Sequence, residues 1–477
     1  MSPSLALFLW FILIVGLLRF DPAKEVETSA ALWIPLTWMF IVASRLPSQW
    51  FGYTARATAA ILEEGIPFDR NIFIAMMVIS IFILISRSFN WVQFFTKNIA
   101  LTTFLIFALL SVVWSDFPSV AIKRWFRDFG IYLTILVALS DVHPMQAVCT
   151  VLRRLFYLLI PLSVLLIKYF PAMSRQYDFW TGIVSYTGAA TSKNTLGVLC
   201  LVSGLFFFWD TLARWSSRKA PITRRIILVN LSFLAMTLWV LQKASSSTSR
   251  VCLALGCIVI LAARTKAGGL RGYLKVLIPL AISLYGLLAF GLGFDLNAIV
   301  AQFLGRDPTL TDRTKIWKVV LSVDTNPLLG TGYESFWLGS RLQKVWQVFP
   351  GINEAHNGYL QMYLQLGFIG LLILCWVLMS FYGSIWRRRD ALSGLAPLSL
   401  ALWTVLAFYN VTEAAFQGGV LWLTLLPGVL ILHQDEIEST QAFSRIRRPT
   451  IKMTKQKSGV PIAPRVTGKI SPGSEAV

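Results

Sequence analysis

One polar stretch lies between two apolar runs and contains three motifs: GRDPTLTDRTKIW at 305–317, PLLGTGYESFW at 327–337 and EAHNGYLQMYLQLGFIG at 354–370. It is the longest polar segment between two apolar runs in the chain. It carries one of the three histidines, His356, directly before an apolar run. We therefore interpret the rest of the chain as a membrane scaffold that holds this loop at one face of a bilayer.

The composition is that of a polytopic membrane protein. The 477 residues are 56% hydrophobic and 14% charged, whereas soluble domains carry about a quarter charged residues. The net charge of +20 lies mostly in short loops and the C-terminal tail, which indicates the positive-inside pattern and no nucleic-acid partner. The five cysteines are scattered in apolar runs without CxxC spacing, so we predict neither a disulfide framework nor a zinc site.

Apolar runs long enough to cross a hydrocarbon core of roughly 30 Å follow one another along residues 1–433. Because the runs at 5–20 and 128–140 are weak, we predict an all-α polytopic membrane protein with 12–13 transmembrane helices. The thirteen runs fall at 5–20, 29–46, 70–86, 98–114, 128–140, 151–170, 192–212, 225–243, 249–263, 273–293, 357–381, 396–410 and 417–433.

Basic clusters predict the orientation of these helices, because Lys and Arg concentrate in cytoplasmic loops. The tail at 434–477 is basic and is predicted to be cytoplasmic and disordered, in contact with anionic lipid. The alternating path that starts there leaves one large loop, about 294–356, on the outer face. The aromatic and basic segment 114–130 is also predicted outside, as an interfacial amphipathic helix.

Several cations are predicted at the outer face, which departs from the positive-inside pattern. They come from separate stretches: Lys193, Arg250, Arg306, Arg313 and His356. Such a group suits a lipid diphosphate, since Arg offers a planar fork and Lys a point charge. Asn194 begins a helix beside one of them, where free N–H groups favour anions. The alternative is that each side chain only extends to water from a helix end, but several cations at the same predicted depth favour a binding site for an anion.

His356 is the candidate general base. A neutral imidazole with a pKa near 6.5 accepts a proton from a sugar hydroxyl at neutral pH, and Glu354 is available to orient it. A structural histidine near a helix N-terminus is an equally good interpretation. Asn357 follows as a candidate substrate contact.

Three aromatic residues of the loop are candidates for stacking on sugar faces: Trp317, Tyr333 and Trp337. Packing inside the loop is the favoured role for at least two of them. No paired acids of the DxD type occur, and the cluster at 433–436 is interpreted as a solvated helix end, so no metal or cofactor is predicted.

The three loop motifs, with WSDFPSVAIKRW at 114–125 and GAATSKNTLG at 188–197, resemble the O-antigen ligase/polymerase (WaaL–Wzy) superfamily, in particular exopolysaccharide-production polymerases of the ExoQ type. The resemblance covers roughly residues 64–433. It implies a GT-C-like helical bundle and a metal-independent glycosyltransferase acting on undecaprenyl-diphosphate-linked glycans.

The resemblance also implies roles for single residues: His356 and Arg313 as catalytic, Arg250 and Lys193 as diphosphate contacts. Two positions depart from the family pattern. Asp312 replaces a usual glycine and is available to pair with Arg313, and Gln365 replaces a frequent glutamate, so no carboxylate role is assumed there.

The predicted function is a polysaccharide polymerase that joins lipid-linked repeat units by inverting glycosyl transfer at the periplasmic face of the inner membrane. Its partners are the lipid-linked donor and acceptor and the membrane, with chain-length regulators or export proteins left open. Two alternatives remain. One is a ligase that transfers glycan to lipid A core or protein, and the other is a non-enzymatic flippase or exporter.

Overall fold

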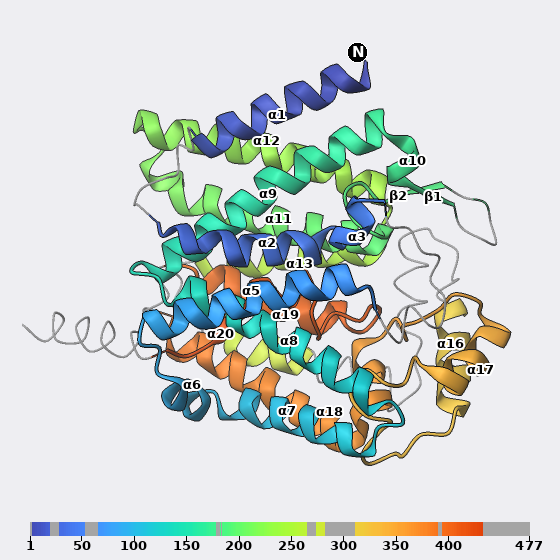
Figure 1. Ribbon diagram of the computed structural model, residues 1–477. Helices are drawn as coiled ribbons and strands as arrows, with labels where there is room; N and C mark the ends of the chain where they lie inside the picture. The colour runs from blue at the N-terminus through green and yellow to red at the C-terminus, as the bar shows by residue number, and fades with distance from the viewer. Residues whose placement is uncertain are drawn as a thin grey trace, which may run out of the picture.

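The chain forms a bundle of helices with one short hairpin (Figure 1). The computed structural model describes residues 2–19, 28–52, 65–177, 182, 184–264, 273–281, 311–389 and 394–432. The hairpin pairs β1 (Arg175–Tyr177) with β2 (Val184–Tyr186) in antiparallel register, Gln176 opposite Ser185. The prediction of an all-α polytopic membrane protein is confirmed, while the predicted tail and residue Arg306 lie outside the described residues.

Most of the longer helices follow the predicted apolar runs, whereas α16 and α17 lie in the predicted outer loop. Those of the first half are α1 (Pro3–Arg19), α2 (Trp33–Ala43), α3 (Pro47–Trp50), α5 (Pro67–Ser86), α6 (Trp91–Lys97), α7 (Ile99–Leu110), α8 (Pro118–Leu139), α9 (Pro144–Tyr169) and α10 (Pro171–Ser174). Those of the second half are α11 (Lys193–Arg214), α12 (Pro221–Ala244), α13 (Ser247–Arg264), α16 (Thr311–Ser322), α17 (Gly339–Val348), α18 (Gly358–Arg387), α19 (Ala396–Tyr409) and α20 (Val420–Val429). Short 3₁₀ turns are η1 (Ala30–Leu32), η2 (Ser111–Trp114) and η3 (Trp215–Ser217).

Membrane-spanning helices are numerous in the described part of the chain. Six are long and apolar enough to cross a bilayer, and a seventh span arises if α6 and α7–η2, bent by 98°, are counted as one. Shorter apolar helices, α1, η1–α2, α19 and α20, occupy four more of the predicted runs. The run at 273–293 is described only to residue 281, so the count of 12–13 stays a prediction.

The predicted interfacial helix at 114–130 is wrong as a separate element. Pro118 begins α8 at a position where a missing N–H costs nothing, and the helix continues without a break to Leu139. The polar first half and the weak apolar run at 128–140 are therefore one helix. Its buried acid, Asp128, is paired with Arg127 and Tyr333, which allows the charge to lie inside the bundle.

The core of the bundle lies around α11, which packs against α12, α13, α19 and α20. Large aromatic side chains fill the space between α9 and α11, with the rings of Phe156 and Phe206 5.6 Å apart and those of Tyr157 and Phe207 6.3 Å apart. A polar network lies in the same layer. Asp210 Oδ2 accepts bonds from Arg153 Nη2 at 2.7 Å and from Asn230 Nδ2 at 2.7 Å, and it joins α9, α11 and α12.

Helix α18 is broken at Gly367, and the loop before it fills the break. Gly367 has φ 64° and ψ −165°, which an L side chain rarely adopts. The freed backbone groups pair with the loop motif at 327–337: Gly332 N–H donates to the Gln365 carbonyl at 2.9 Å, and Phe368 N–H donates to the Pro327 carbonyl at 2.9 Å. A Cβ at Gly330 or Gly367 would collide with this neighbouring backbone, so both close approaches require glycine.

The predicted outer segments lie together at one end of the bundle. In Figure 1 the hairpin, α10, α16 and α17 all lie at the right-hand end. Helices α16 and α17 have a small apolar core of their own, built on Val320, Phe336, Trp337 and Val345. The loop is therefore a folded layer over the membrane helices, with α16, α17 and the motif at 327–337 fixed against α18.

Candidate active site

Glu413 is the centre of a charged cluster at this end of the bundle. It lies in the turn between α19 and α20, and its side chain is 5% exposed. Its Oε1 accepts a bond from Arg313 Nη2 at 2.5 Å, and its Oε2 accepts one from Asn194 Nδ2 at 3.0 Å. A buried carboxylate among apolar helices requires such partners. This one acid therefore joins the first turns of α11 and α16.

His356 completes the cluster from the segment before α18. Its Nδ1 lies 2.9 Å from Glu354 Oε1 and 3.5 Å from Glu413 Oε2. The Nε2 makes no hydrogen bond or ion pair with the residues that the structure describes, which leaves it available to a ligand. The backbone of His356 has φ 47°, an uncommon value for a residue other than glycine, and such strain is often found at functional sites.

Backbone contacts hold this segment in place. The N–H of Gly358 donates to the Asn410 carbonyl at 2.8 Å and to the Glu413 carbonyl at 2.9 Å. The Asn357 side chain caps α18 by accepting a bond from Leu360 N–H at 3.0 Å, and Trp317 Nε1 donates to the Ala355 carbonyl at 2.9 Å. The start of α18 is thus tied to the turn that carries the buried acid.

The charge of the cluster changes the expected state of the histidine. Burial alone would lower the pKa of His356, but the neighbouring carboxylates of Glu354 and Glu413 outweigh it and raise the pKa to about 9. The expectation of a neutral imidazole with a pKa near 6.5 is therefore wrong for this arrangement. At neutral pH the ring is an imidazolium, and Nε2 is a proton donor until that proton leaves.

The same residues have the chemistry of a metal site. One ligand atom from each of Glu354, His356 and Glu413 lies within 4.8 Å of the others. Both oxygens of Glu413, however, already accept bonds, one of them from the cation of Arg313. The positive charge of Arg313 next to Glu413 Oε1 therefore offsets the negative charge of the cluster without a metal ion.

The structure brings three of the predicted site residues into contact with one another through Glu413: Asn194, Arg313 and His356. Lys193 is the exposed first residue of α11, directly beside Asn194. Arg250 is exposed and donates from Nη2 to the Gln242 carbonyl of α12 at 3.0 Å, and within the described part of the chain no hydrogen bond or ion pair joins it to the cluster. The side chain of Asn357 is 99% buried as a helix cap, and Arg306 is not described.

The three aromatic candidates have different environments. Tyr333 is buried, and its hydroxyl donates to Asp128 Oδ2 at 2.9 Å. Trp337 is also buried, and its Nε1 donates to Gln361 Oε1 at 2.9 Å. Trp317 is half-buried beside the His356 segment. Of the three, it is therefore the one with a ring surface near the cluster.

Sequence reasoning missed Glu413. The signal for it was a single acid in the short gap between the apolar runs at 396–410 and 417–433, because an ionisable residue at membrane depth marks a functional site by default. Its partners are 57 or more residues away along the chain, so no local motif contains it. Only the packing of the α19–α20 turn against the start of α18 shows its role.

Comparison with known proteins gives two matches. Residues 231–375 match the O-antigen ligase family model, a region that includes Arg250, Arg313 and His356 and ends before Glu413. The chain is also 25% identical over 304 residues to the exopolysaccharide production protein ExoQ of Rhizobium meliloti (strain 1021). That alignment covers 60% of this chain and 64% of the relative. The two matches confirm the resemblance that the motifs predicted.

Proposed function

From the similarity of this multi-pass membrane protein to the O-antigen ligase superfamily and to an exopolysaccharide production protein, we propose that it is a polysaccharide polymerase. It joins undecaprenyl-diphosphate-linked repeat units by inverting glycosyl transfer. The reaction takes place at the periplasmic face of the bacterial inner membrane. The donor is a growing glycan on its lipid diphosphate, and the acceptor is a sugar hydroxyl of the next lipid-linked unit.

The observation that carries this proposal is the cluster of Arg313, Glu413 and His356 at the outer end of the bundle. Three helices, α11, α16 and α18, begin there. Helix N-termini favour anions because their first N–H groups are free and their dipoles are positive. The site therefore combines an anion-binding environment with a positioned acid–base residue, which is what displacement of a diphosphate requires.

The proposed reaction is a single displacement. The acceptor oxygen forms a bond to the anomeric carbon of the donor while the bond from that carbon to the diphosphate oxygen breaks with its electron pair. In the neutral form of His356, after the imidazolium has lost its Nε2 proton to solvent, the hydroxyl proton moves to Nε2, while Nδ1 faces Glu354 and Glu413. Arg313 and the exposed Lys193, next to Asn194, stabilise the negative charge that develops on the diphosphate.

Replacement of the histidine tests the proposal. Purified His356→Ala protein, supplied with lipid-linked repeat units in detergent, is expected to make no polymer while remaining folded and abundant. His143→Ala is the matched control, because this exposed histidine precedes α9 and lies outside the cluster. Full-length polymer from His356→Ala would overturn the assignment of the base.

Arg313 supplies a second test. Its guanidinium is a planar fork, and Lys would restore the charge without the fork. Arg313→Lys should therefore lower the rate by about 10²–10³, the usual effect of losing one electrostatic contact in a transition state. A rate equal to wild type would reduce Arg313 to a snorkelling cation.

The alternatives give different outcomes in the same assay. A ligase would place glycan on lipid A core or on a protein acceptor, and would need that acceptor in the mixture. An exporter would make no product in micelles, which have no second compartment. Polymer formed from repeat units alone would support the polymerase over both.

A further inference from the structure

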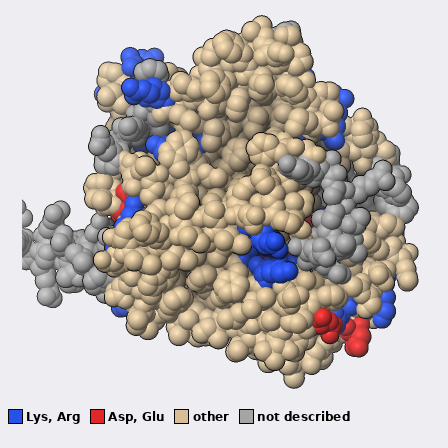
Figure 2. Space-filling model, in the orientation of Figure 1, with Lys and Arg blue, Asp and Glu red and all other residues tan. Residues whose placement is uncertain are grey.

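A basic patch lies on the outer surface of α5 and α8, away from the cluster around Glu413. Figure 2 shows Lys and Arg side chains gathered in the middle of this face, where α5 and α8 run in Figure 1, with the other charged side chains nearer its edges. The exposed basic residues of these two helices are Arg70, Lys123 and Arg127. Their neighbours Ile122 and Phe126 are exposed apolar side chains, as expected for a surface that faces lipid.

Two of these cations form one binding face. Lys123 and Arg127 are four residues apart on α8, so their side chains project from the same side of the helix. Arg127 is held at its Nε by Asp128 Oδ1 at 2.9 Å, which leaves its two terminal nitrogens without a partner among the described residues. Lys123 likewise has no hydrogen bond or ion pair in the described part of the chain. Cations at a membrane surface are costly without a partner, so an anion is expected here.

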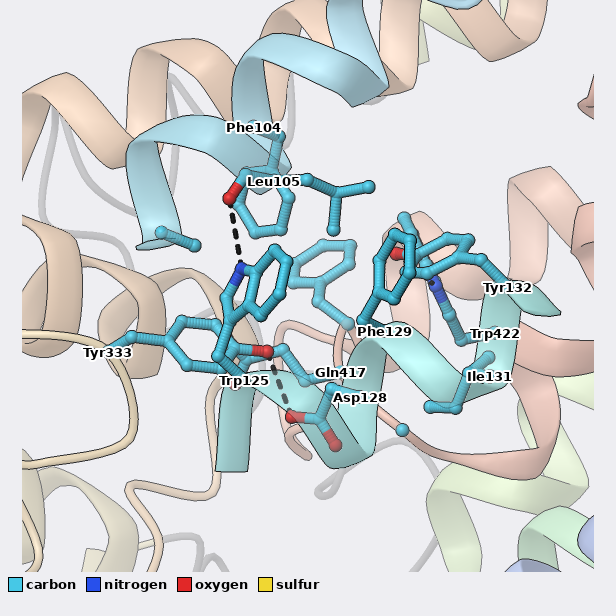
Figure 3. A pocket seen from close by; sticks show the side chains of 13 residues that line it. Phe104, Leu105, Trp125, Asp128, Phe129, Ile131, Tyr132, Tyr333, Gln417 and Trp422 are labelled. Atoms are coloured by element: carbon cyan, nitrogen blue, oxygen red, sulfur yellow. Dashed lines mark hydrogen bonds between the residues drawn. The ribbon is translucent and has the colours of Figure 1, made fainter. Parts of the chain in front are cut away.

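The residues beneath the patch are held in place by hydrogen bonds. Asp128 is buried and accepts a second bond, from the Tyr333 hydroxyl at 2.9 Å (Figure 3), so Arg127 is paired with a carboxylate that is itself held in place. Trp125, Tyr132 and Trp422 line the small cavity next to it, whose volume of about 10 Å³ has room for a single water. A ligand therefore binds on the surface of the patch and does not enter the bundle.

A series of polar contacts links the residues beneath the patch to the candidate active site. Glu334, next to Tyr333, lies 3.8 Å from Arg124 and accepts a bond from Gln365 Nε2 at 3.1 Å. Gln365 Oε1 in turn accepts a bond from Gln417 Nε2 at 3.1 Å. Gln417 belongs to the same turn as Glu413. The patch and the cluster are thus both connected to the turn between α19 and α20.

We propose that Lys123 and Arg127 bind the diphosphate of the second lipid-linked substrate, the acceptor, while its lipid tail lies along the apolar surface of α5 and α8. This inference rests on the proposed function, since polymerisation joins two chains that each end in a lipid diphosphate. Arg127 supplies the fork and Lys123 the point charge for the two phosphate groups. An anionic phospholipid headgroup offers similar chemistry, so the experiment must separate the two lipids.

The test counts bound lipid on the full-length protein by native mass spectrometry, with undecaprenyl diphosphate and phosphatidylglycerol as probes. Wild type is expected to retain two undecaprenyl diphosphates, and Lys123→Ala/Arg127→Ala only one. The affinity for the lost equivalent should fall by roughly 10- to 100-fold for each charge-assisted contact removed. Arg218→Ala/Lys219→Ala, which removes the same two charges from the exposed loop between α11 and α12, should still bind two.

Each other outcome overturns the proposal. Two undecaprenyl diphosphates on Lys123→Ala/Arg127→Ala would show that the patch does not hold this lipid. Selective loss of phosphatidylglycerol would make the patch an anchor for ordinary lipid. If the double variant fails to fold, Arg127→Lys is used instead, because it keeps the positive charge and can still pair with Asp128. It should lower the affinity for the second undecaprenyl diphosphate and leave the affinity for the first unchanged. Failure of the proposed function is seen separately, as wild-type protein that makes no polymer from lipid-linked repeat units while it still retains two undecaprenyl diphosphates.

Discussion

Raising the pH from 7 to 9 should increase the rate of polymerisation, because the proposed base is protonated at neutral pH. The carboxylates of Glu354 and Glu413 favour the imidazolium form of His356 and raise its pKa to about 9. A base must lose that proton before it can accept one from a sugar hydroxyl. The active fraction of the protein is therefore small at pH 7 and grows with pH.

The size of the effect follows from the titration. With a pKa of about 9, the neutral fraction of His356 is about 1% at pH 7, about 10% at pH 8 and one half at pH 9. The rate should thus rise about tenfold from pH 7 to 8 and about 50-fold from pH 7 to 9. Folding raises this pKa above the unfolded value near 6.5, so its contribution to stability is complete below pH 6.5 and lost as the pH rises through 9. A gain in rate over this window therefore cannot come from stabilisation.

The assay is the initial rate of polymer formation by purified protein in detergent with saturating lipid-linked repeat units, measured in overlapping buffers from pH 6 to 10. Glu354→Gln is the matched variant, because it removes one of the two carboxylates next to Nδ1 and keeps the shape of the side chain. The inflection of its profile should lie at lower pH than that of wild type. A second variant, Glu413→Gln, should move it in the same direction.

A rate that is flat between pH 6 and 8 and falls above pH 9 would refute the reasoning. That profile would make His356 a donor, acting as imidazolium on the leaving diphosphate, and the base would have to be sought elsewhere. An inflection that stays in place in Glu354→Gln would show that the titrating group is a different one.

Four further predictions concern the site and the scaffold. Glu413→Ala should cost about 1–3 kcal/mol of stability, because it removes the buried acceptor of the bonds from Arg313 and Asn194; thermal unfolding in detergent measures this, and an unchanged midpoint would contradict it. Gly367→Ala should greatly lower the amount of folded protein in membranes, since its Cβ collides with the loop backbone, whereas Gly383→Ala in the same helix meets open space and should be tolerated. Asp210→Ala should destabilise the bundle by about 3–5 kcal/mol, because it removes the buried carboxylate that pairs with Arg153 and Arg214, with activity per folded molecule unchanged. Polymer formation should survive chelation by EDTA, and a loss restored by Mg²⁺ would instead assign the carboxylates around His356 to a metal.

Much of the site could be predicted because its charges are conspicuous in an apolar chain. The outer loop, Arg313 and His356 stand out against the positive-inside rule, and the start of α11 places Asn194 at the same depth. Hydropathy also gave the helices, because each must satisfy its own backbone inside lipid. These inferences depend only on which residues are polar and where the apolar runs end.

The remainder required the packing of the chain. The sequence predicts the depth of a residue along a helix but not the direction of its side chain. Arg250 was therefore expected at the cluster, whereas its side chain donates to the end of α12. The state of His356 depends on two carboxylates, and only Glu354 is near it in the sequence; Glu413 comes from another turn. Hydropathy likewise gave 357–381 as one run, although α18 is broken at Gly367. Each of these features is a relation between distant segments.

The break in α18 has a consequence for how the outer layer can move. Lipid offers no hydrogen-bonding groups, so the backbone freed at Gly367 is satisfied only while the motif at 327–337 stays paired with it. Opening the loop would therefore leave several buried N–H and carbonyl groups without partners at once. The motif at 327–337 is therefore expected to stay in place against α18 while substrates bind and leave, so any opening of the outer layer must occur at other segments.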